Sequence, residues 1–151
     1  MYSTVLLLHS WLRWATLLLG VVVTLAALVD RGEGKSTADR LGLFFMIAMD
    51  TQMLLGLLLY FALSPVTAAA LKDFGGAMRD PALRFWAVEH AGTMMLAVIL
   101  AHVGNVLARK ATTPASKRTR QIVCFGLATV AMIARTPWPG LANGRPLFRL
   151  P

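Results

Sequence analysis

Charged residues and cysteine are both scarce in this chain of 151 residues. Only 15% of the residues are charged, whereas 57% are hydrophobic, which is too apolar for a soluble domain of this size. The single cysteine, Cys124, cannot form a disulfide within the chain and fits none of the multi-cysteine metal patterns. The composition therefore indicates a membrane protein that consists almost entirely of spanning helices.

Acidic residues are fewer than basic ones, with 7 Asp and Glu against 15 Lys and Arg, so the formal net charge is +8. Such an excess can indicate binding to nucleic acid. Here, however, the basic residues lie mainly at the ends of apolar runs, where contact with anionic lipid and control of orientation account for them. We therefore expect the lipid bilayer as a partner and no nucleic acid.

The apolar runs are long enough to span a bilayer, since one span needs about 20 residues. They cover residues of about 5–29, 41–63, 82–108 and 119–136. The polar segments "DRGEGKSTADR" and "RKATTPASKRTR" separate runs, and the proline-rich "RTPWPGLANGRP" ends the last one. The expected fold is all-α, an integral membrane four-helix bundle in one domain over residues 1–151, with a short surface helix around "PVTAAALKDF".

The basic residues are distributed unevenly between the two ends of the predicted bundle. The loops after the first and third runs carry Arg31, Lys35, Arg40, Arg109, Lys110, Lys117, Arg118 and Arg120, and the opposite end carries Lys72, Arg79, Arg84, Arg145 and Arg149. By the positive-inside rule, the end that is richer in cations faces the cytoplasm. We therefore expect a multi-pass protein of the bacterial inner (cell) membrane, with both termini in the periplasm.

Polar side chains within the runs form two layers when depth is counted at about 1.5 Å of rise per residue. The outer layer contains His9, Arg13, Tyr60, Glu89, His90 and Arg135, and the inner layer contains Asp50, Gln52 and His102. Ionisable residues inside a membrane are costly and commonly mark a functional site. Both layers are therefore candidate sites.

The residues of the outer layer are typical of a haem-binding site. His9 and His90 lie within roughly 5 Å of the same depth, and two imidazoles on facing helices are the axial ligands that a b-type haem needs inside a bundle. Arg13 shares a helix face with His9, and Arg13 and Arg135 are candidates to bind the haem propionates. In a simpler alternative, both arginines pair with Glu89 and hold helices together, and His9 is an ordinary interface residue.

The inner layer cannot form a second bis-histidine site, because His102 has no partner histidine at its depth. We expect Asp50 and His102 to form either a hydrogen-bonded pair or a proton-handling site, since an aspartate within the membrane needs a partner. A quinone could approach Tyr60, Gln52 or this pair. Gly20, Gly56, Gly92 and Gly104 are expected to allow close helix contact.

Several segments carry a resemblance to a known family. "LLLHSWLRW", "MDTQMLLGLLLYF", "RDPALRFWAVEHAGTMMLA" and "RTPWP" together resemble small four-helix bacterial integral membrane proteins that are loosely labelled cytochrome b-like. The resemblance covers nearly the whole chain and implies one membrane haem b, with His9 and His90 as ligands. In that pattern a histidine often occupies the place of Asp50, so no role is carried over to the second helix.

The expected function is that of a membrane b-type cytochrome, or a haem-bearing subunit of a larger respiratory or redox complex or homo-oligomer. It would transfer single electrons, with a quinol as candidate donor, rather than act as a stand-alone enzyme. Glu89 would orient a ligand or an arginine. The alternative is a haem-free accessory subunit that packs in a larger membrane complex. A transporter built around Asp50 is less favoured, because the sequence has no inverted repeat.

Overall fold

The computed structural model describes residues 1–31 and 34–149, and all regular elements within them are helical. The α-helices are α1 (Tyr2–Val29), α2 (Thr37–Leu58), α3 (Pro65–Lys72), α4 (Phe74–Arg79), α5 (Pro81–Arg84), α6 (His90–Arg109) and α7 (Pro114–Arg135). One π-helical turn, η1 (Leu59–Leu63), extends α2, and another, η2 (Phe85–Glu89), joins α5 to α6. The all-α prediction is confirmed, and the expected surface helix is present as α3.

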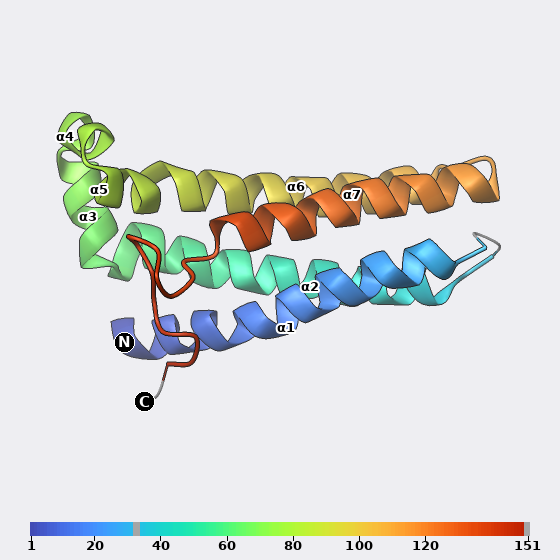
Figure 1. The fold of residues 1–151 in the computed structure, drawn as a ribbon, viewed down its shortest axis with the longest axis horizontal. Coiled ribbons are helices and arrows are strands. Elements are labelled where there is room, and N and C mark those ends of the chain that lie inside the picture. Colours follow the sequence, from blue (N-terminus) through green and yellow to red (C-terminus); the bar gives the residue numbers. More distant parts are fainter. Residues whose placement is uncertain (32–33, 150–151) are drawn as a thin grey trace.

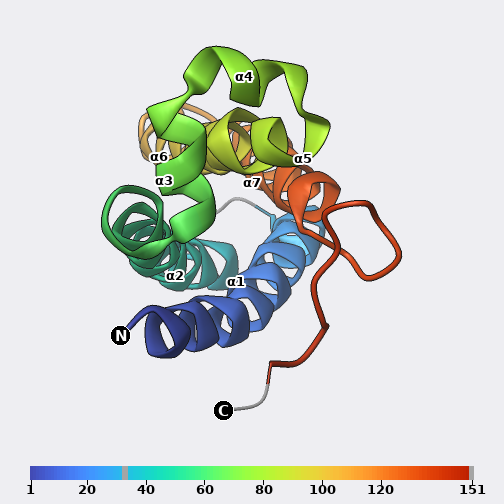
Figure 2. The same ribbon diagram turned by 90° about the vertical axis from the view of Figure 1, so that its left-hand side faces the viewer.

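The long helices α1, α2, α6 and α7 run side by side (Figure 1). Their most extensive contacts are between α6 and α7, followed by those of α1 with α2 and with α7. Helices α3, α4 and α5 gather at one end together with the N-terminus, and Figure 2 views the molecule from that end. We call it the cap end. The opposite end, where α1 stops and α7 starts, is called the loop end.

Three helical segments among the described residues are long and apolar enough to cross a membrane: Tyr2–Val29, Thr37–Leu63 and Pro81–Arg109. Their bounds lie close to the first three predicted runs. The fourth predicted run is also helical, as α7, but Lys117, Arg118, Arg120 and Arg135 make it more polar than the other three. Large apolar side chains face outward on the long helices, including Leu54 at 68% and Phe61 at 73% exposure.

The core lies between the long helices, and two kinds of contact hold it together. The rings of Phe45 and Phe125 meet edge to face, with their centroids 5.9 Å apart. Small residues bring other backbones close: a Cβ atom added to Gly20 would lie 2.6 Å from Thr129 Oγ1, and one added to Gly104 would lie 2.4 Å from the Cβ of Cys124. Helices α1 and α6 therefore approach α7 at distances that only glycine permits.

Basic side chains at the loop end stabilise the ends of helices. The guanidinium of Arg118 donates to the carbonyl of Leu28 at the end of α1, and Arg120 donates to Leu107 near the end of α6 at 2.7 Å. Lys117 Nζ lies 2.6 Å from the Asp39 carboxylate in the first turn of α2. Cations at helix C-termini satisfy free carbonyls and interact favourably with the helix dipole. These residues therefore have a structural role beside any effect on orientation.

Candidate functional site

A cavity of about 470 Å³ opens near the cap end, between α1, α2, α6, both π-helical turns and the C-terminal segment. Its volume is within the range of about 300–1,000 Å³ that is typical of small-molecule sites. Much of its wall is apolar, with Leu6, Leu17, Met53, Met94 and Val98 among the lining residues. Such a cavity can enclose a largely apolar ligand.

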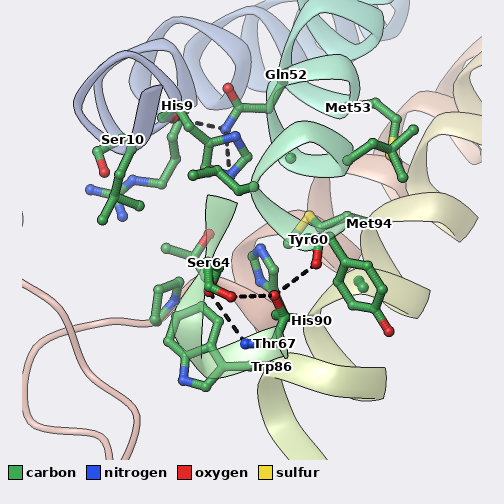
Figure 3. Close-up of a pocket in the computed structure, with 18 of the residues that line it drawn as sticks. His9, Ser10, Gln52, Met53, Tyr60, Ser64, Thr67, Trp86, His90 and Met94 are labelled. Carbon is green, nitrogen blue, oxygen red and sulfur yellow. Dashed lines mark hydrogen bonds between the residues drawn. The ribbon is translucent and has the colours of Figure 1, made fainter. Parts of the chain in front are cut away.

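His90 enters this cavity from the start of α6 (Figure 3). Its Nδ1 lies 2.8 Å from the backbone carbonyl oxygen of Arg135. Since a carbonyl oxygen only accepts, Nδ1 donates the proton, and Nε2 of the neutral ring retains its lone pair. This is the arrangement in which proteins commonly hold a metal-ligating histidine, because the second nitrogen fixes the orientation and tautomer of the ring.

His9 lines the same cavity from α1 (Figure 3). The side-chain amide of Gln52 donates to the His9 carbonyl oxygen at 2.9 Å and lies 3.5 Å from His9 Nε2. Among the described residues, His9 Nδ1 is buried and has no hydrogen-bond partner. A Cβ atom added to Gly56 would lie only 3.3 Å from His9 Cε1, so this glycine makes room for the ring. A buried nitrogen without a partner costs stability, which suggests that a ligand satisfies it.

The structure thus brings together the two histidines that the sequence singled out, one from α1 and one from α6. Figure 3 shows them in the same pocket, with Tyr60 and Met94 beside His90 and Gln52 beside His9. The arrangement offers two imidazoles from separate helices to one ligand.

The π-helical turns shape the wall beside His90. The hydroxyl of Tyr60, in η1, donates to the carbonyl of Ala87, in η2, at 2.7 Å. Thr67 Oγ1 in turn donates to the carbonyl of Tyr60 at 2.8 Å. Single π-helical turns shift the backbone register and occur frequently at functional sites. Tyr60 also lines the cavity, and its hydroxyl links the two π-helical turns.

Glu89 is held by two arginines outside the cavity wall. Its Oε1 accepts from Arg84 Nε at 2.9 Å, and its Oε2 lies 3.3 Å from an Arg135 guanidinium nitrogen. Arg13 lines the cavity instead and donates to the carbonyl of Leu147 at 2.8 Å. The expected link between Arg135 and Glu89 is therefore present, whereas Arg84 takes the place that the ionic alternative gave to Arg13.

The C-terminal segment, residues 136–149, contributes to the site although the sequence indicated nothing of the kind. It leaves α7 and returns across the cap end toward α1 (Figure 2). Arg145 and Arg149 from this segment line the cavity. The only available sequence signal was indirect: Trp11 and Trp14 on α1 carry indole donors that need partners, and they find them in this segment.

Asp50 and His102 form a hydrogen-bonded pair, with Asp50 Oδ1 2.8 Å from His102 Nε2. Their side chains are 49% and 47% exposed, and neither residue lines the cavity. Gln52 contacts His9 and not Asp50. The reason is rotational, because two residues turn a helix by about 200° and place Gln52 on the opposite face of α2 from Asp50.

The described residues contain no group of three or more His, Cys, Asp and Glu side chains that could hold a metal ion. No family model, curated protein or solved structure matches the chain.

Proposed function

We propose that this chain is an integral membrane b-type cytochrome that binds one haem b in the cavity and passes single electrons. One observation carries the proposal: His9 and His90, from separate helices, line a single apolar cavity that also has arginines in its wall. His9 and His90 would hold the haem, because imidazole nitrogens ligate haem iron and the interior of a helix bundle suits the porphyrin. The resemblance to cytochrome b-like proteins in "LLLHSWLRW" and "AVEHAG" agrees with it.

The proposal places α1, α2 with η1, α5 to α6, and α7 across the bacterial inner membrane as a four-helix bundle. Three of these segments have the length and hydropathy of spans. We include α7 because it packs closely on α6 and α1 and contributes Phe125, Ala128 and Met132 to the shared core. The excess of cations at the loop end favours the cytoplasm for that end and the periplasm for both termini.

Neighbouring residues hold and orient His9 and His90, the two proposed ligands of the haem iron. The Arg135 carbonyl orients His90 through Nδ1, and Gln52 ties the His9 backbone to α2. Gly56 leaves space for the His9 ring. When bound, haem b supplies the one-electron chemistry of its iron, and the axial ligands and apolar surroundings set its potential. Such a protein serves as an electron carrier, alone or as a subunit of a larger redox complex.

The test is an absorption spectrum of the detergent-purified protein, oxidised and then reduced with dithionite, together with a pyridine haemochrome assay. We expect one b-type haem per chain with low-spin bands. His9→Gln and His90→Gln should each abolish the low-spin spectrum, since glutamine keeps a hydrogen-bonding side chain but lacks the imidazole nitrogen. His102→Gln is the matched control, because His102 lies outside the cavity, and it should leave the spectrum unchanged.

Colourless wild-type protein from cells with ample haem would overturn the proposal and favour the haem-free accessory subunit. A normal low-spin spectrum in the His9 or the His90 variant would remove that residue as a ligand. Comparable amounts of each variant in the membrane fraction would show that a lost spectrum does not reflect failed insertion.

A further inference from the structure

The cavity has a cationic wall that no carboxylate of the described residues balances. Arg13, Arg145 and Arg149 all line it, together with the two histidines, and none of the Asp and Glu residues that the structure describes does so. A concentration of positive charge in the wall of an apolar cavity attracts an anionic group of the ligand. The ligand therefore needs an apolar body and an acidic end.

Most carboxylates in the described ranges already have partners away from the cavity. Asp39 pairs with Lys117, Asp50 with His102, and Glu89 with Arg84 and Arg135. Asp73 and Asp80 accept backbone N–H groups at the starts of α4 and α5. The ion pairs among the described residues leave out Arg145 and Arg149, and the Arg145 guanidinium lies over the ring of Trp86, 5.2 Å from its centroid.

The segment that carries these two arginines is fixed to α1 at several points. Trp11 Nε1 donates to the carbonyl of Arg149 at 2.9 Å, and Trp14 Nε1 donates to that of Leu147 at 3.0 Å. The Phe148 ring stacks on Trp14, with centroids 5.6 Å apart. Arg13 adds its own bond to Leu147. We call this anchored segment, residues 136–149, the C-terminal strap. Because it is already held in place, little conformational entropy is lost in ordering its arginines when a ligand binds.

We propose that this C-terminal strap is the part of the site that recognises anions, and that Arg145 and Arg149 bind the carboxylates of the ligand. For the haem b of the proposed function, on which this inference rests, these groups are the two propionates. Arg135 is not needed for this role, since Glu89 already holds it. Guanidinium groups suit the task because they pair with carboxylates through two parallel N–H donors.

The test compares two ligands that differ only at the acidic end. Haem b and its dimethyl ester, in which both propionates are neutral, are titrated into haem-free protein in detergent and followed by absorbance. We expect Arg145→Gln and Arg149→Gln each to weaken haem b binding roughly tenfold, the usual effect of losing one charge-assisted hydrogen bond. Neither should change the affinity for the ester. Arg79→Gln, which removes a cation of the same end outside the cavity, should leave both affinities unchanged.

The outcomes separate this inference from the proposed function. Wild-type protein that binds neither ligand overturns both. Tight haem b binding that survives in the Arg145 and Arg149 variants overturns the role of the strap and leaves the cytochrome in place. An equal loss for haem b and for its ester also overturns it, since the arginines would then hold the strap in position without recognising charge.

Discussion

At the scale of single residues, the polar atoms near the cap end are almost all committed to specific partners. The His90 Nδ1 donor has the Arg135 carbonyl, the Tyr60 hydroxyl has Ala87, and the Glu89 carboxylate has two arginines. Among the described residues, the buried atoms His9 Nδ1, Arg13 Nε and Gln52 Oε1 have no hydrogen-bond partner. Because imidazole nitrogens are common metal ligands, the histidines, rather than Glu89 or Tyr60, are the strongest candidates for contact with a ligand.

Glycine 104 offers a test of packing at one residue. Gly104→Ala would place a methyl group 2.4 Å from the Cβ of Cys124, so α6 and α7 must separate. Overpacking of this kind typically costs about 1–3 kcal/mol, and we expect a lower midpoint for thermal unfolding in detergent.

Gly92→Ala is the matched control for that substitution, because nothing lies within 4 Å of the added Cβ atom. It should hold or raise the midpoint, since alanine favours a helix over glycine by up to about 1 kcal/mol. Equal midpoints for the two variants would contradict the close contact between α6 and α7.

At the scale of elements, the π-helical turns η1 and η2 depend on each other. The bond from the Tyr60 hydroxyl to the Ala87 carbonyl joins them across the cavity wall. η2 ends immediately before His90, so any change in its register also moves that imidazole. The short helices α3 and α5 also do more than connect longer ones, because α3 packs against both turns and α5 packs against η2.

Tyr60→Phe tests this link. The substitution keeps the ring but leaves the Ala87 carbonyl without its donor, which typically costs about 1–3 kcal/mol for a buried group. We expect a lower thermal midpoint and, if haem is bound, a change in its low-spin bands. Tyr2→Phe serves as the control, since Tyr2 also lines the cavity. An unchanged midpoint for Tyr60→Phe would show that the turns do not rely on this bond.

At the scale of the whole molecule, charge and hydropathy make the two ends different. The loop end carries basic residues that also hold helix ends: Arg118 and Arg120 of α7 donate to the carbonyls of Leu28 in α1 and Leu107 in α6. The cap end carries the cavity, the strap and the N-terminus. In the proposed orientation, the ligand site lies near the periplasmic face, within reach of a periplasmic electron partner.

Labelling of single cysteines tests that orientation. In a Cys124→Ala background, Lys72→Cys places a thiol at the cap end and Lys35→Cys places one at the loop end. A membrane-impermeant maleimide added to spheroplasts should label position 72 and leave position 35 unlabelled until the membrane is opened. Labelling of position 35 alone would invert the proposed orientation, and labelling of both positions in sealed spheroplasts would contradict insertion across the membrane.

Much of the fold could be predicted because it depends on local signals. Apolar runs of spanning length predicted the three longest helical segments, and the prolines of "RTPWP" predicted where α7 ends. Depth along a helix follows from a constant rise, which is why His9 and His90 were expected in one layer. The π-helical turns had no comparable signal, since π-turns have no local sequence rule that would distinguish "LYFAL" and "FWAVE" from ordinary helix.

By itself, the sequence determined the helical class, the approximate helix bounds and the pair of histidines, because these follow from hydropathy, residue type and helical rise. Only the tertiary structure decided which polar groups meet. Gln52 contacts His9 and not Asp50. Glu89 pairs with Arg84 as well as with Arg135. The C-terminal strap places Arg145 and Arg149 in the wall of the cavity. The physical reason is that pairing depends on how each helix is rotated and crosses its neighbours, and on where an irregular segment finds donors such as Trp11 and Trp14.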